Sequence, residues 1–146
     1  MRALSHGGGR CRSVRTMMTA GEKLLAGAFL LSGTVHLLRP QVFEPIVPRA
    51  LPGKRALVLG SGVAELACGA GLLHPRSRGP AGLASAALLV AVLPANVQMA
   101  VSHAGRARHT RRPAHLVGFA GTLLRVPLQW PLIRIALGAA RRGQAA

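Results

Sequence analysis

The chain has 146 residues, half of them hydrophobic, and its 19 Lys and Arg against three Asp and Glu give a formal net charge of +16. That length predicts one domain, and such a charge would ordinarily suggest nucleic acid. The basic residues, however, gather between long apolar runs, as they do beside membrane spans, and no basic stripe is interleaved with aromatic residues for stacking on bases. We therefore expect a lipid bilayer, and no nucleic acid, as the partner.

Residues 1–19 are basic, rich in Gly and free of acids, and they lack the apolar core of a signal peptide. We expect a disordered tail there; a transit peptide and a misassigned start, with Met17 or Met18 as the true one, both stay open. Cys11 lies in this tail and Cys68 in an apolar run, without any metal-ligand spacing. The sequence therefore predicts no metal site, and no disulfide between the two cysteines.

The first predicted helix covers residues 20–38. Thr19 is its expected N-cap, and Glu22 follows three residues later, as in a capping box. His36 lies near the far end, on the same face as Ser32. Such a histidine is either an interfacial hydrogen-bonding residue or a ligand.

Residues 39–54 contain four prolines, which exclude a long regular helix. Apolar residues, Phe43 among them, lie between the prolines. We expect this segment to lie on the membrane surface or to fold over the helix ends, with a stiff linker as the alternative.

The second predicted helix covers residues 55–73 and has Glu65 in its middle. A charge at that depth of a membrane costs about 2.5–3.5 kcal/mol, so it is usually paired or functional. Ser61 and Gly69, one turn before and after, let a neighbouring helix approach closely. The alternative is a buried helix of a soluble domain. The short polar turn at 74–80 predicts that the second and third helices are antiparallel neighbours.

The third predicted helix, residues 81–101, contains no charged residue and is the clearest membrane span. Asn96 lies within it, and Pro94 frees the carbonyl of Val90. A basic loop is expected at 102–114.

The fourth predicted helix, residues 115–140, contains two prolines, which free the carbonyls of Leu123 and Pro127, and is followed by a short tail at 141–146. Arg125 lies near the middle of the helix, and Gln129 follows one turn later on the same face.

Glu65 and Arg125 are predicted to lie at the same depth in the membrane. Glu65 is ten residues past Arg55, and Arg125 is ten past His115; at 1.5 Å per residue both lie about 15 Å deep, near the middle of a bilayer. We therefore predict an ion pair between Glu65 and Arg125, either as part of a ligand or proton site or only to fix helix register. The candidate intramembrane pocket comprises His36, Glu65, Asn96, Arg125 and Gln129.

The predicted fold is all-α, a four-helix transmembrane bundle over residues 20–140. Within that range a series of short motifs follows in order: His36, Pro40, Phe43, Val47-Pro48, Leu51-Pro52, Ser61 to Glu65, Pro94 to Asn96 and Leu124 to Gln129. In these residues the chain resembles the DoxX family of small bacterial integral membrane proteins, although Leu37 stands where an aromatic residue is expected. The resemblance implies a multi-pass protein of the bacterial cell membrane with links to redox systems, since some relatives are subunits of a quinone-reducing thiosulfate oxidoreductase and others belong to complexes for oxidative-stress and thiol defence.

The function expected from these observations is that of an accessory or subunit of a membrane redox system, quinone- or thiol-linked. A quinone is a possible cofactor, because its carbonyls need donors such as Arg125, Asn96 or Gln129. No haem, flavin or iron–sulfur ligand set is visible, and catalytic activity is left open. The alternatives are an assembly or stability factor for a partner membrane protein, and a small transporter or proton path.

Overall fold

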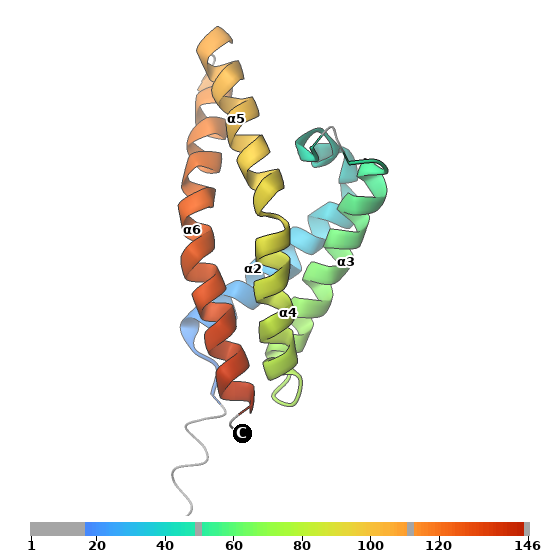
Figure 1. Ribbon diagram of the computed structural model, residues 1–146, viewed down its shortest axis with the longest axis vertical. Helices are drawn as coiled ribbons and strands as arrows, with labels where there is room; N and C mark the ends of the chain where they lie inside the picture. Colours follow the sequence, from blue (N-terminus) through green and yellow to red (C-terminus); the bar gives the residue numbers. More distant parts are fainter. Residues whose placement is uncertain (1–16, 49–50, 111–112, 145–146) are drawn as a thin grey trace, which may run out of the picture.

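The computed structural model describes residues 17–48, 51–110 and 113–144 (Figure 1). Across these ranges all regular secondary structure is helical, which confirms the all-α prediction. The elements are α2 (Ala20–Leu38), the 3-10 helices η1 (Pro40–Val42) and η2 (Glu44–Ile46), α3 (Lys54–Leu73), α4 (Arg78–Ala91), α5 (Leu93–Thr110) and α6 (Pro113–Gln144).

Helix α2 begins with the predicted capping box. The Thr19 N–H donates to Glu22 Oε2 at 2.7 Å, and the Glu22 N–H donates to Thr19 Oγ1 at 3.2 Å. These two bonds satisfy amide groups that a helix N-terminus otherwise leaves without partners. The helix ends at Leu38, two residues before Pro40, so both of its predicted bounds are confirmed.

The helices form four rods of alternating direction (Figure 1). Helix α2 packs against α3, α3 against α4, and α4 and α5 together form one bent rod along α6. The start of α2 meets the end of α6, where Arg142 Nη2 lies 2.6 Å from Glu22 Oε1. Both described ends of the chain therefore lie at the same end of the bundle.

Helices α2 and α3 cross at two glycines. A Cβ atom on Gly33 would lie 2.7 Å from the carbonyl oxygen of Gly62, and one on Gly62 would lie 2.8 Å from His36 Cβ. Gly69, which the sequence pattern marked as a small contact residue, is also close to α2, at 3.1 Å from the carbonyl oxygen of Ala26. This backbone approach brings His36 alongside α3.

The third predicted helix is broken where the sequence analysis expected it to continue. Helix α4 ends at Ala91 and α5 begins at Leu93, next to Pro94, which has no N–H to donate to the carbonyl of Val90 and so bends or breaks a helix. Beyond the break, α5 runs to Thr110, so the predicted loop at 102–114 is helical over most of its length. Positive charge alone does not end a helix, and Arg and Ala are good helix formers.

Helix α4 also begins earlier than expected, at Arg78, with Pro80 inside its first turn. A proline is tolerated there because the first amides of a helix have no intrahelical acceptor. The predicted polar turn therefore shortens, and α3 and α4 pack as the expected antiparallel neighbours.

The apolar core lies where α2, α3, α4 and α6 meet, and it includes Leu25, Phe29, Leu72 and Leu89. Cys68 is buried in this core as a free thiol. Cys11 lies outside the described residues.

Two described segments, Lys54–Leu73 and Arg78–Val101, are long and apolar enough to cross a membrane.

Candidate functional site

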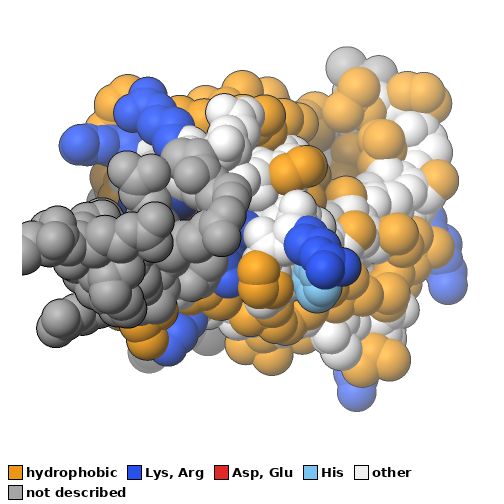
Figure 2. Space-filling model, turned by 90° about the horizontal axis from the view of Figure 1, so that it is seen from below, with side chains coloured by type: hydrophobic (Ala, Val, Ile, Leu, Met, Phe, Trp, Pro, Cys, Tyr) orange, Lys and Arg blue, Asp and Glu red, His pale blue; other side chains and the backbone are white. Residues whose placement is uncertain are grey.

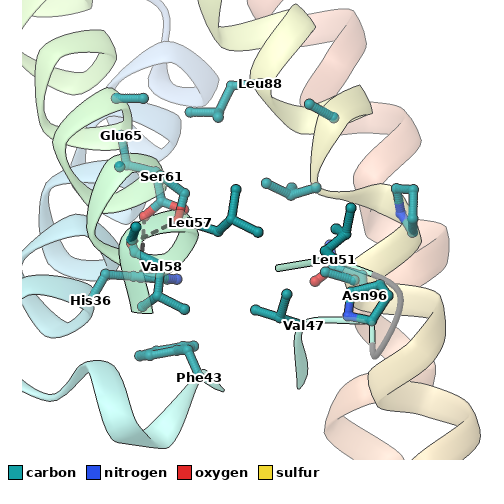
Figure 3. Close-up of a pocket in the computed structure, with 18 of the residues that line it drawn as sticks. His36, Phe43, Val47, Leu51, Leu57, Val58, Ser61, Glu65, Leu88 and Asn96 are labelled. Carbon is teal, nitrogen blue, oxygen red and sulfur yellow. Dashed lines mark hydrogen bonds and ion pairs between the residues drawn. The ribbon is translucent and has the colours of Figure 1, made fainter. Parts of the chain in front are cut away.

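A cavity of about 510 Å³ lies between α3, the junction of α4 with α5, and the segment from η1 to Leu51 (Figure 3). Its volume is within the range of small-molecule sites. Most of its lining is apolar, and the polar side chains on it are those of His36, Ser61, Glu65 and Asn96. The apolar side chains include Phe43, Val47, Leu51, Leu57, Leu88 and Met99.

The break in the third rod makes this space. Helix α3 packs against α4, and above the junction at Val92 the segment with η2 lies between α3 and α5. Val47 and Leu51 of that segment face the cavity (Figure 3). The proline-rich segment therefore forms part of the cavity wall and folds over the helix ends, one of the two placements expected for it.

His36 and Glu65 lie on the α2–α3 side of the cavity (Figure 3). His36 Nδ1 is 3.7 Å from Glu65 Oε2, beyond hydrogen-bond distance. The same Nδ1 is 2.8 Å from the carbonyl oxygen of Ser32. A carbonyl only accepts, so Nδ1 carries the proton and donates it to Ser32. Glu65 Oε2 is buried and has no hydrogen-bond partner among the described residues.

The His36 ring is held by Phe43. The two rings are stacked, with centroids 3.8 Å apart and planes 15° from parallel. Such aromatic pairs contribute about 0.5–1.5 kcal/mol beyond the area they bury. Phe43 thus fixes the end of α2 to the segment that closes the cavity.

Asn96 and Gln129 form a second polar group on the far side. Asn96 Nδ2 donates to Gln129 Oε1 at 3.1 Å, and Gln129 Nε2 donates to the carbonyl oxygen of Leu89. The sequence predicted a free carbonyl near Pro94, at Val90; the carbonyl that Gln129 binds is instead that of Leu89. Gln129 thereby ties α6 to the break between α4 and α5.

A second cavity, of about 420 Å³, lies between α2, α4 and α6 and is lined by Phe29, Leu128 and Leu132 among others. Glu65 and Asn96 line both cavities, so the two spaces adjoin at these residues.

Four of the five predicted pocket residues thus gather around two adjoining cavities: His36, Glu65, Asn96 and Gln129. The fifth, Arg125, belongs to α6, but its side chain lies outside the described residues. Its ion pair with Glu65 stays a prediction. The described basic side chain that lies beside the Glu65 carboxylate is that of His36.

Sequence reasoning missed the glycine crossing of α2 and α3 as the feature that places His36. Gly33 and Gly62 carry no signal of their own among the 18 glycines of the chain. It also missed Phe43 as a partner of His36, although an apolar residue in a proline-rich segment was the available signal.

Among the described residues, no group of three or more His, Cys, Asp or Glu side chains is placed to hold a metal ion.

Comparisons with curated proteins and with solved structures found no match. The sequence does match a family described as "Domain of unknown function (DUF8561)", over residues 25–140. This match covers all the residues on which the resemblance to DoxX depended, so that assignment was wrong, and the redox role that came with it loses its basis. Short motifs around buried polar residues are weak family markers, because many helical bundles need a Glu, an Asn or a Pro at such positions. The chain belongs to the family described as Domain of unknown function (DUF8561).

Proposed function

We propose that the protein is an integral membrane protein of four spans that binds a small, largely apolar molecule in the cavity beside Glu65. One observation carries the proposal: at an apolar cavity of about 510 Å³, a buried carboxylate oxygen has no hydrogen-bond partner within the described part of the chain. A buried polar group without a partner costs free energy. A bound molecule that supplies the missing donor removes that cost.

The outer surface of the bundle supports a membrane location. Only 33% and 17% of the apolar windows in Lys54–Leu73 and Arg78–Val101 are buried, whereas the core helix of a soluble protein is mostly buried. On α2, Leu24, Leu31 and Leu38 are each at least 70% exposed. In the view from below in Figure 2, hydrophobic side chains also lie around much of the described outline of the bundle. Lipid tails would solvate these side chains, while the polar groups face inward.

The polar residues of the cavity support a ligand with a polar head. His36 and Glu65 lie on one side and Asn96 on the other (Figure 3). Pockets of this kind commonly combine apolar walls with a few polar groups that orient the bound molecule. A quinone headgroup, the ligand expected from the sequence, could accept a bond from the Asn96 amide, but its carbonyls only accept and do not supply the donor that Glu65 Oε2 lacks.

A second candidate function is a small transporter or proton path. The observation in its favour is that the two cavities adjoin at Glu65 and Asn96, so that an acidic side chain lies between two internal spaces. Proton flux into liposomes containing the protein, lost in Glu65→Gln, is the result expected of that function.

The ligand proposal is tested by purifying the protein from alkali-washed membranes and identifying retained small molecules by native mass spectrometry. Ala64 lines the cavity, so Ala64→Phe should fill it and release the bound molecule. Ala67 is exposed on the same helix, so Ala67→Phe serves as the matched control and should retain it. Recovery of the wild type in the soluble fraction contradicts the membrane location. Equal retention by the two variants contradicts the assignment of the cavity.

A further inference from the structure

We infer that the molecule bound beside Glu65 is a lipophilic amine, an apolar body with one protonated nitrogen that contacts the Glu65 carboxylate. This inference rests on the proposed function, since it uses the same cavity and names the chemistry of its ligand. It follows from three features of the cavity: its charges, the hydrogen bonds of His36 and the positions of its acceptors.

The first feature is the sign of the charge. Glu65 is the one acidic residue among the described lining residues, and none of them is Lys or Arg. The whole chain has 19 Lys and Arg and only three acids. A cavity lined by one of the three acids, without a described permanent cation, is therefore opposite in charge to the rest of the molecule.

The second feature is that His36 does not satisfy Glu65. Its Nδ1 proton goes to the carbonyl oxygen of Ser32 at 2.8 Å, and Glu65 Oε2 remains 3.7 Å away. The stacking of Phe43 on the His36 ring opposes a rotation that would bring Nδ1 closer to Glu65. Among the described residues, therefore, no side chain supplies the donor that Oε2 needs.

The third feature is the geometry of the acceptors. Glu65 has a relative exposure of 6% and lines the cavity, and Figure 3 shows its carboxylate on the side that faces His36. An ammonium group offers up to three donors, one of which can meet Oε2 while its charge neutralises the carboxylate. Charge-assisted hydrogen bonds of this kind are about twice as strong as neutral ones. A carboxylic acid anion or an acceptor-only head would face Oε2 with like polarity.

The experiment compares three probes that share one apolar cage and differ in the head: 1-aminoadamantane, 1-adamantanol and 1-adamantanecarboxylate. Binding to the full-length protein in lipid nanodiscs is measured by calorimetry at neutral pH. We expect the amine to bind at least tenfold more tightly than the alcohol and the carboxylate to bind more weakly than either. Glu65→Gln should reduce the preference for the amine to below threefold.

Glu44→Gln is the matched control, because it removes another acid, in η2, whose side chain does not line the cavity. It should leave the tenfold preference unchanged. If Glu65→Gln does not fold, the relative affinities of the three probes for the wild-type protein still test the inference. An alcohol that binds as tightly as the amine overturns the inference and leaves the proposed function intact. No binding of any of the three cages, together with no retained molecule in native mass spectrometry, overturns both.

Discussion

At the scale of single residues, Gly62 and Glu65 show how one face of α3 serves two purposes. Three positions apart in a helix, they share a face. Gly62 lets α2 approach so closely that a Cβ atom added at position 62 would lie 2.8 Å from His36 Cβ. That approach places His36 near Glu65, so the glycine determines the surroundings of the acid.

We predict that Gly33→Ala destabilises the bundle. The added methyl group would lie 2.7 Å from the carbonyl oxygen of Gly62 and 2.9 Å from Leu66 Cγ, so the helices must move apart. Overpacking of this kind costs about 1–3 kcal/mol. Thermal unfolding in detergent should show a lower melting temperature than that of the wild type.

Gly27→Ala is the control on the same helix. A Cβ atom there meets nothing within 4 Å, and alanine is favoured over glycine in a helix by about 1 kcal/mol. Its melting temperature should equal or exceed that of the wild type. Equal melting of Gly33→Ala and Gly27→Ala would mean that α2 and α3 do not cross at these glycines.

At the scale of elements, the irregular segment with η1 and η2 forms part of the cavity wall and holds His36. Prolines prevent a long helix, yet two 3-10 turns give the chain enough order to place Phe43 on His36 and Val47 on the cavity. At its end, Gly53 adopts φ +65°, a left-handed conformation that glycine reaches without strain, and α3 begins at the next residue.

Phe43→Asp is expected to lower both stability and ligand binding. The substitution removes the ring stack with His36 and places a charge without a partner against the cavity, a change that costs at least about 1 kcal/mol. The measurements are thermal unfolding and binding of the adamantane probes. Val42→Asp, at an adjacent exposed position, should leave both close to wild-type values. If Phe43→Asp behaves like Val42→Asp, the segment is only a linker.

At the scale of the whole molecule, the alternation of four rods sets the topology of the proposed membrane protein. The start of α2 and the end of α6 meet through Glu22 and Arg142, and the turn between α3 and α4 lies at the same end (Figure 1). The segment between α2 and α3 lies at the other end.

Reporter fusions should reveal this arrangement. Fusions at Thr19, in the turn at 74–77 and after Gln144 are expected in one compartment, and a fusion at Pro52 in the opposite one. Compartment-specific reporter activity in intact cells is the measurement. Opposite compartments for the Thr19 and Gln144 fusions would require an odd number of spans and would contradict the proposed topology.

The sequence by itself determined the helical class, the bounds of α2 and the residues around which the cavities lie. These features are local: a capping box, a proline or a polar residue in an apolar run acts through its own backbone and hydropathy. The basic residues in the segment predicted as a loop did not end α5. Charged side chains are compatible with a helix, and the helix propensity of this segment is favourable.

Only the tertiary structure decided which polar residues meet. Depth along each helix placed Glu65 level with Arg125, but rotation and spacing of the helices depend on contacts such as the Gly33–Gly62 crossing, which no single helix contains. That crossing puts His36 beside Glu65, and the break at Val92 gives Gln129 the carbonyl of Leu89. Pairing across helices depends on how closely two backbones approach, and this distance is fixed by packing between segments far apart in the sequence.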